Sequence, residues 1–343
     1  MANALPDKPK KAMKDSTHNH CSEATSTVFI AVLSAISFIA LVGNSLVVIT
    51  FFKTANLRTS SNYYIVNMAA SDVLCSYFSW LVYATEGAIT GRMWISDPLA
   101  SVLCKIGIYV RVTSQIVSVL SLLAIAVDRY FAIVFPLRTT SMHKERVRFA
   151  ILLFIWITSG ALCCPGILYA NVVESNGDSF CRLLWNQSAY KIYHSIGIVL
   201  LYFTPLITII IFYYRILRAL RARLMSGNRL QDSQNITLIQ NQQVIKILIS
   251  IVFAFFFCWT PLCIYFVLKI FQPGLFLEDT CHIIVVLLFY VFPSLITVIN
   301  PLILFLFSTN YRQALANLRA LCRVNSVGIS PLHVTTVQMM EIH

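Results

Sequence analysis

The stretch Ser118-Val-Leu-Ser-Leu-Leu-Ala-Ile-Ala-Val-Asp128-Arg129-Tyr130 leads from a long apolar segment directly into an adjacent acid and base. Charge near a membrane core is costly, so such a pair usually lies at an interface or serves a function. Arg and Tyr also favour the headgroup level, which would make the pair a simple anchor. The stretch alone leaves both interpretations open, and the rest of the chain has to decide between them.

The composition describes an integral membrane protein. The 343 residues are 58% hydrophobic and only 12% charged, with a mean hydropathy of +0.74. A soluble protein of this length would need a more charged surface. The 10 cysteines include no C-x-x-C pair, so zinc and redox motifs find no support. Residues 1–27 are polar and lack the apolar centre of a signal peptide, so we expect the first membrane helix to direct its own insertion.

Seven apolar segments are each long enough to cross about 30 Å of hydrocarbon. They predict an all-α membrane protein, a seven-transmembrane helix bundle with an extracellular segment at 1–27, the bundle at 28–307, an amphipathic helix at 308–322 and a cytoplasmic tail at 323–343. The predicted spans are Val28–Phe52, Tyr63–Ala84, Leu103–Phe135, Phe149–Asn171, Ile192–Tyr214, Ile247–Leu268 and Ile283–Phe307.

The charge distribution predicts how the chain is oriented. With the N-terminus outside, the cytoplasmic parts hold 16 basic and 4 acidic residues, which accounts for the whole formal charge of +12. The positive-inside rule favours this arrangement, although four lysines before the first span oppose it mildly. We therefore expect a multi-pass protein of the plasma membrane with its N-terminus extracellular and its C-terminus cytoplasmic.

Residues 308–322 alternate apolar and basic residues at helical spacing. This pattern is typical of a helix that lies on the inner leaflet. Cys322 stands at its end between Arg319 and Arg323, which makes it a candidate for S-palmitoylation, with an unmodified cysteine as the alternative.

Seven short motifs, each in a different span and in chain order, carry a family resemblance. They are Asn44 in Gly43-Asn44-Ser-Leu-Val, Asp72 in Asn67-Met-Ala-Ala-Ser-Asp72, Asp128-Arg129-Tyr130, Trp156, Pro205, Cys258-Trp259-Thr-Pro261 and Asn300-Pro301. The chain resembles the rhodopsin-like (class A) G-protein-coupled receptors, and among these most the neuropeptide receptors. The resemblance implies a non-enzymatic receptor that binds an extracellular ligand and activates a heterotrimeric G protein by helix movement at its inner face. Arrestin is a further implied partner, no cofactor is required, and nucleic acid is not a partner.

Asp72 is a lone acid near the middle of the second span, and an isolated carboxylate in hydrocarbon is costly. By similarity to the family, it would bind a sodium ion together with polar residues of other spans. The alternative is a dry polar cluster that holds the helices together. The other candidate ligands are Asn44, Ser118, Thr297 and Asn300.

Prolines inside the last three spans predict kinks, because each removes a backbone hydrogen bond. The resemblance makes Trp259, one turn above Phe255 and beside Pro261, a toggle, and places Arg129 and Tyr213 where an entering G-protein helix would meet them. The prolines are Pro205, Pro261, Pro293 and Pro301, and the remaining switch residues are Asp128, Tyr130 and Asn300. Two departures concern switching: Leu304 stands where the family usually has tyrosine, and Asn241 where an acid would restrain Arg129.

On the outer side, the resemblance implies a disulfide between Cys104 and Cys181. Cys21 and Cys281 are the remaining extracellular cysteines and are expected to form a second bridge. Asn186-Gln-Ser188 is a glycosylation sequon on the same side.

Arg111 lies seven residues below Cys104, about 10 Å deeper at 1.5 Å per residue. Amine receptors of the family have an acid at this point, so the reversed charge disfavours a simple amine ligand. Arg111 would either receive an acidic or amide group of the ligand, with Gln115 one turn further, or pair with Glu86 in a structural bridge. The resemblance adds Trp259, Leu262, Phe266 and Tyr290 to the ligand pocket.

Acidic residues of the outer loops favour a basic peptide, which makes a neuropeptide the expected ligand. A class A receptor for a small non-amine, acidic ligand is the alternative. An ion-coupled transporter is a remote one, because such proteins usually show internal repeats and paired broken segments, and this sequence shows neither. An enzyme is not expected, since the sequence has no intramembrane metal set or nucleophile dyad.

Overall fold

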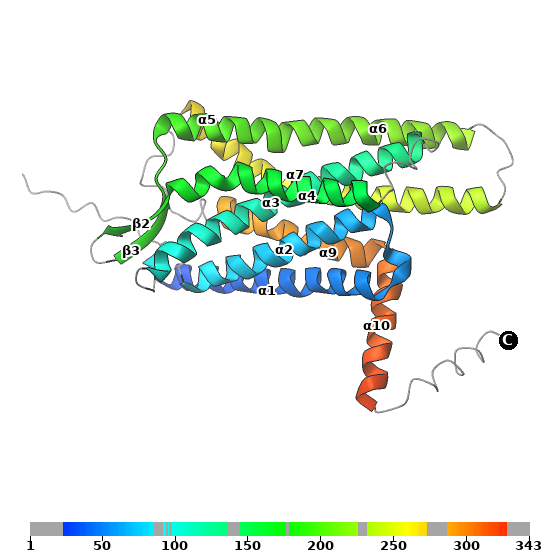
Figure 1. Ribbon diagram of the computed structural model, residues 1–343, viewed down its shortest axis with the longest axis horizontal. Helices are drawn as coiled ribbons and strands as arrows, with labels where there is room; N and C mark the ends of the chain where they lie inside the picture. Colours follow the sequence, from blue (N-terminus) through cyan, green and yellow to red (C-terminus); the bar gives the residue numbers. More distant parts are fainter. Residues whose placement is uncertain are drawn as a thin grey trace, which may run out of the picture.

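The computed structural model describes residues 23–85, 92–93, 95, 98–135, 145–175, 178–225, 232–272 and 287–327. Long helices run side by side in one bundle, with a small sheet at one end and a helix standing across the other end (Figure 1). The helices are α1 (Glu23–Lys53), η1 (Ala55–Leu57), α2 (Ser60–Thr85), α3 (Leu99–Val134), α4 (Glu145–Tyr169), α5 (Gln187–Ile198), η3 (Val199–Phe203), α6 (Thr204–Met225), α7 (Asp232–Phe271), η5 (Leu287–Val291), α9 (Phe292–Phe307) and α10 (Thr309–Val327).

Six helical segments in the described part are long and apolar enough to cross a membrane by themselves. A seventh candidate is α9 taken together with α10, which leaves α9 at an angle of 90° (Figure 1). The π-helical turn η5 directly precedes α9. This arrangement confirms the predicted seven-helix bundle with an additional helix across its end.

Two crossings contain a π-helical turn directly before a proline. η3 precedes Pro205 in the continuous run α5–η3–α6, and η5 precedes Pro293 at the start of α9. Proline has no backbone N–H to donate, so the preceding carbonyl groups need other partners. Before Pro205, the backbone N–H of Thr204 donates to the Val199 carbonyl, which also accepts from the Thr204 hydroxyl at 2.8 Å. The predicted interruptions of these spans are therefore present, while Pro261 and Pro301 lie inside continuous helices.

The predicted boundary of the fourth span was wrong at its outer end. The helix stops at Tyr169, and Asn171 belongs to a strand. Most other boundaries are wider than predicted, because helix continues beyond the apolar core where polar residues can still form backbone hydrogen bonds. Thus α1 begins at Glu23, before the expected limit of the N-terminal segment, and α10 continues past Cys322. The third span is an exception at its inner end, since α3 stops at Val134 and not at Phe135.

A three-stranded antiparallel sheet covers one end of the bundle (Figure 1). Its strands are β1 (Arg92–Met93), β2 (Ala170–Ser175) and β3 (Asp178–Leu183), in the order β1-β3-β2. The β2–β3 hairpin pairs Ala170 with Leu183 at its base. Sequence analysis did not predict this hairpin.

Small and polar residues hold the helices close together. Gly43 of α1 lies against Pro301 of α9, where a Cβ atom on residue 43 would approach the proline Cγ to 2.9 Å. Trp156 of α4 donates to Asn67 of α2 at 2.9 Å, and Asn67 donates to Ser121 of α3, also at 2.9 Å. These contacts fix the helices around a cluster of polar residues and an outer cavity.

Candidate ligand-binding site and inner-face switch

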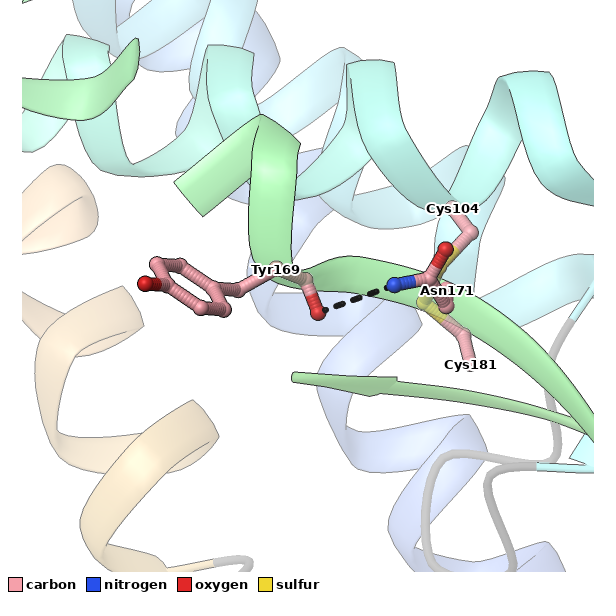
Figure 2. The surroundings of a disulfide bond; sticks show 4 residues. All are labelled: Cys104, Tyr169, Asn171 and Cys181. Atoms are coloured by element: carbon pink, nitrogen blue, oxygen red, sulfur yellow. Dashed lines mark hydrogen bonds between the residues drawn. A yellow bond between two sulfur atoms is a disulfide. The ribbon is translucent and has the colours of Figure 1, made fainter. Parts of the chain in front are cut away.

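A disulfide bond ties the outer end of α3 to the hairpin. Cys104 is bonded to Cys181 of β3, and their Cα atoms are 5.6 Å apart (Figure 2). In the same view, Asn171 of β2 donates to the Tyr169 carbonyl at 3.5 Å, where the chain passes from helix to strand. The predicted pairing is confirmed, and it holds the hairpin over the bundle.

Beneath the hairpin, a cavity of about 730 Å³ lies between α3, α4, α5 and α7. Five of the predicted ligand residues line it: Arg111 and Gln115 from α3, and Trp259, Leu262 and Phe266 from α7. Trp259 lines it more deeply, together with Phe255. Cavities of this size, mostly apolar with a few polar groups, are the usual form of a ligand site.

Arg111 lies against Tyr290 of η5. The guanidinium carbon is 4.9 Å from the centre of the Tyr290 ring, within the range of a cation–π interaction. The two predicted ligand residues therefore meet, although Tyr290 is not part of the cavity wall. Glu86, the alternative partner of Arg111, lies outside the described residues.

The Trp259 ring stacks on Phe255 of the same helix, with ring centres 5.8 Å apart. Both rings face the cavity, and the Trp259 indole nitrogen is buried with no hydrogen-bond partner in the described part of the chain. A ligand that reaches the cavity floor would therefore touch Trp259 directly. This position agrees with the predicted toggle without testing it.

Sequence analysis missed the polar residues that α5 contributes to the cavity. Lys191 and His194 line it, and so does Lys269 near the outer end of α7. His194 packs against Phe266 with ring centres 4.6 Å apart, and Lys269 lies 5.3 Å from the centre of the Tyr190 ring. The sequence did contain one signal of this polar face. Gln187, which also lines the cavity, and Lys191 are four residues apart and therefore share one face of α5.

The charges of the cavity wall have one sign. Its described lining includes Arg111, Lys191 and Lys269 but no Asp or Glu. Most of the acidic residues that favoured a basic peptide, among them Glu278 and Asp279, lie outside the described residues. Glu174 is exposed on β2. The cavity itself thus suits a ligand group that is negatively charged or strongly polar.

Deeper in the bundle, Asp72 joins three helices. One carboxylate oxygen accepts a hydrogen bond from Ser118 at 3.0 Å, and the other accepts from Asn300 at 3.1 Å. Asp72 is 2% exposed. Buried charge of this kind needs such partners, so the predicted cluster of Asp72, Ser118 and Asn300 is formed.

The two other predicted sodium ligands adjoin this cluster less directly. Asn44 donates to the Thr297 carbonyl at 2.7 Å and to the Ala40 carbonyl at 2.9 Å. The Thr297 hydroxyl donates to the Ser294 carbonyl of its own helix at 2.7 Å. Both residues therefore support the helix packing beside Asp72.

The residues present fit a small hard cation. The carboxylate of Asp72 supplies charge, and the Asn300 side-chain oxygen is buried without a hydrogen-bond partner in the described part of the chain. Oxygen ligands of this type are those that hard cations take.

At the opposite end of α3, Arg129 is held by its neighbour. Its Nε and Nη2 atoms donate to one oxygen of Asp128 at 3.2 and 2.8 Å, and Ser61 of α2 donates to the same oxygen. The Arg129 side chain is only 16% exposed. The charge pair that opened the sequence analysis is therefore a buried cluster between α2 and α3, which an exposed anchor would not form.

Tyr130 links α3 to α6. Its hydroxyl accepts from Arg215 at 3.2 Å, and its ring stacks on Phe212 with centres 4.6 Å apart. Tyr213, predicted to swing toward Arg129, is buried in the core close by. Leu304, the first departure from the family pattern, is buried in the same core. The side chain of Asn241, the second departure, lies outside the described residues.

Several predicted sites are not described. Cys21 and Cys281 lie outside the described residues, and Cys322 lies in α10 but its side chain is not described. Asn186 is exposed at the start of α5, where its side-chain oxygen accepts from the Ala189 amide at 2.7 Å. The amide nitrogen that would carry a glycan is not used in this cap.

Comparison with known proteins places these features in a family. The family "7 transmembrane receptor (rhodopsin family)" matches residues 43–304. The substance-K receptor of Bos taurus is 28% identical over 276 residues, covering 78% of this chain and 69% of its own. The tachykinin-like peptides receptor 86C of Drosophila melanogaster is 31% identical over 258 residues, 70% of this chain and 48% of its own.

The QRFP-like peptide receptor of Branchiostoma floridae is 26% identical over 324 residues, which cover 92% of this chain and 82% of the receptor. The family match includes Asp72, the Asp128–Tyr130 stretch and Asn300, all of which the structure places in the polar clusters described above. With its seven crossings, the disulfide and the outer cavity, the chain belongs to the rhodopsin family of seven-transmembrane receptors.

Proposed function

We propose that this receptor binds an extracellular neuropeptide and activates a heterotrimeric G protein. The observation that carries the proposal is the 730 Å³ cavity, whose wall joins Arg111 at one level to Trp259 at a deeper one. By their names, the relatives reported above are receptors for substance K, tachykinin-like peptides and a QRFP-like peptide. A peptide terminus in this cavity would contact α3 and α7 together.

The charge of the cavity favours a peptide that brings an acidic or amide group to Arg111. Arg111, Lys191 and Lys269 would all attract such a group, and the described wall offers no acid to compete with it. The same observation favours the second candidate, a small acidic ligand. The two differ in size, because a peptide would also have to contact the hairpin strands β2 and β3 above the cavity.

The inner face supports coupling to a G protein. Arg129 is held inside a buried cluster with Asp128 and Ser61, and Tyr130 is held by α6. Release of Arg129 would present a cation and expose a groove between α3 and α6 to an incoming helix. Arrestin would use the same face. The basic inner segments, the orientation predicted from them and the plasma membrane as location form part of this proposal.

A sodium ion at Asp72 is a further part of the proposal. Asp72, Ser118 and Asn300 would hold it, and it would supply a positive charge that stabilises the ionised carboxylate in the bundle. The unpartnered oxygen of Asn300 supports this assignment. A dry polar cluster is the alternative, and sodium titration of agonist affinity distinguishes the two.

The test is ligand-dependent guanine-nucleotide exchange in vesicles that contain the purified receptor and a promiscuous G protein. A library of neuropeptides is compared with a set of small organic acids. Half of the peptides end in a free carboxylate and half end in an amide. Exchange stimulated by a peptide supports the proposal, and exchange stimulated only by small acids supports the second candidate. Solute flux without nucleotide exchange in the same vesicles would instead support a transporter.

A further inference from the structure

A hydrogen bond between two side chains joins the run α5–η3–α6 to α7. The hydroxyl oxygens of Tyr202 in η3 and Thr260 in α7 are 2.7 Å apart. Thr260 also donates to the Phe256 carbonyl of its own helix at 2.6 Å. A hydroxyl has one hydrogen to donate, so Tyr202 is the donor in the bond between the two helices. The Tyr202 ring adds an edge-on contact with the Phe256 ring, with ring centres 5.4 Å apart.

The two ends of this bond differ in their access to the outer cavity. Tyr202 belongs to the cavity wall, together with Trp259, which directly precedes Thr260 in α7. Thr260 is not among the described residues that line the cavity. A ligand that fills the deep part of the cavity beside Trp259 would therefore contact one end of the bond and not the other.

The bond lies where both helices depart from regular α-helical hydrogen bonding. Tyr202 is the fourth residue of the π turn η3, and such turns are frequent at functional sites. Thr260 directly precedes Pro261, which has no N–H to donate to the carbonyl four residues earlier. The Thr260 hydroxyl donates within its own helix instead, and a threonine that does so often bends the helix. The bond thus holds together two helices at points where each can change its course.

The helix run that carries Tyr202 is held a second time near the inner face. There, Phe212 and Arg215 of α6 contact Tyr130 of α3. Arg215 follows Tyr202 by 13 residues, or about 20 Å of helix at 1.5 Å per residue. One continuous crossing therefore has one contact at the cavity wall and another beside Arg129.

We propose that the Tyr202–Thr260 hydrogen bond is a latch that stabilises the resting arrangement of α7 against α6, and that a ligand in the deep part of the cavity releases it by contact with the Tyr202 ring. The latch rests on the proposed function, because the cavity that it borders is the proposed peptide site. It differs from the stack of Trp259 on Phe255, which lies within a single helix.

The test compares Tyr202→Phe with Thr260→Val, which remove the hydroxyl from opposite ends of the latch and keep the shape of each side chain. Guanine-nucleotide exchange is measured in vesicles with a promiscuous G protein and no added ligand. Each variant should raise this basal exchange about three-fold, the effect of losing one hydrogen bond between membrane helices. The double variant should raise it no further, because both substitutions remove the same interaction.

Thr208→Val is the matched control. The Thr208 hydroxyl also donates to the carbonyl four residues earlier, at 2.8 Å, but both groups of that bond lie in α6. Thr260→Ser keeps the hydroxyl and should behave like the unmutated receptor. Thermal unfolding is recorded for every variant, since a purely structural bond would lower the unfolding temperature and leave basal exchange unchanged.

A second measurement does not depend on a G protein. Spin-labelled non-canonical amino acids replace Tyr214 of α6 and Ile249 of α7, both of which are exposed, and pulsed electron resonance records the distance between the labels. Each latch variant should enlarge a second population of distances by a factor similar to the rise in exchange, whereas Thr208→Val should not. The most active peptide of the library described above should enlarge the same population in the unmutated receptor.

Basal exchange and label distances that stay unchanged in both latch variants would overturn the proposal. A change in Tyr202→Phe alone would also contradict it, because Thr260 would then not be the partner that matters. A peptide that stimulates exchange without enlarging the second population would refute release of the latch by the ligand. Shifted distances without nucleotide exchange in any sample would instead refute the proposed coupling to a G protein and support the latch.

Discussion

The hydroxyl of Tyr130 on α3 accepts a hydrogen bond from Arg215 on α6, at 3.2 Å. The Tyr130 ring lies on Phe212, three residues before Arg215, with the planes 12° apart. One residue of α6 thus holds the hydroxyl while another holds the ring. Because this contact joins α3 to α6 beside Arg129, it restrains the movement of these two helices relative to each other.

Tyr130→Phe should weaken this restraint without removing the aromatic stack. Arg215 is exposed, so the hydrogen bond is expected to contribute no more than about 1 kcal/mol. We expect basal nucleotide exchange to rise by at most about five-fold, since a lost restraint shifts the population only by its own free energy. Tyr214→Phe, on the exposed face of α6, is the matched control. Unchanged exchange in the Tyr130 variant would show that the bond does not restrain the receptor.

The bundle was predictable because hydropathy and charge act over whole segments. An apolar stretch of membrane length is stable in lipid as a helix. The basic residues of the loops are expected to collect on the cytoplasmic side. The β2–β3 hairpin was not predictable in this way. Its strands are 6 residues each and lie at one end of the bundle, and no strong alternation of apolar and polar residues marks them. The end of the fourth span was therefore placed at Asn171 and not at Tyr169.

The residues of the candidate site were likewise predictable only in part. Single charged residues in apolar segments, such as Asp72 and Arg111, could be singled out because a buried charge is costly unless it has a partner or a function. The structure brings Asp72 to Ser118 and Asn300 as expected. Lys191 and Lys269 lie near helix ends, where a lysine can also reach water, so the helical spacing of Gln187 and Lys191 was not enough to place them in the cavity.

Cys104→Ser should abolish surface expression or ligand binding, because the bridge to Cys181 holds the hairpin over the cavity. Loss of a native disulfide typically costs about 2–5 kcal/mol. Cys164→Ser, which changes an exposed free cysteine, is the control and should be neutral. Surface expression by flow cytometry and ligand binding are measured together. Normal binding in the Cys104 variant would contradict the structural role of this bridge.

Asp72→Asn should remove the sodium sensitivity of agonist affinity. The substitution keeps the size of the side chain but eliminates the formal charge that a cation needs, while Ser118 and Asn300 remain. Agonist binding is measured across a sodium titration, with potassium as the control ion at equal ionic strength. If the unmutated receptor binds agonist equally in both salts, the dry polar cluster is the correct description of this site.

Asn241→Glu should lower basal nucleotide exchange. Position 241 lies on α7 toward the inner face, and an acid there would pair with Arg129 and restrain the inactive arrangement. The unmutated receptor is therefore expected to show measurable basal exchange. Gln242→Glu places the same charge on a neighbouring face of the helix and is the control. Basal exchange no higher than in membranes without receptor would count against a weakly restrained inactive state.

Substitution of Arg111 distinguishes a structural role of this residue from a direct contact with the ligand. Its guanidinium lies against the Tyr290 ring and lines the outer cavity, so it is placed to do either. If Glu86 is its partner, Arg111→Gln and Glu86→Gln should each lower surface expression. The double variant should then recover part of the loss, because the two substitutions remove one interaction.

If a ligand group is the partner, Arg111→Gln should leave surface expression intact. Agonist affinity should fall by roughly 1.5–3 kcal/mol, the range for a hydrogen bond to a charged group, and potency by about ten-fold or more. An agonist analogue without its acidic or amide terminus should already bind weakly to the unmutated receptor, and Arg111→Gln should weaken it no further. Equal losses for the agonist and the analogue would exclude the direct contact, since the variant would then be acting on the cavity and not on that terminus.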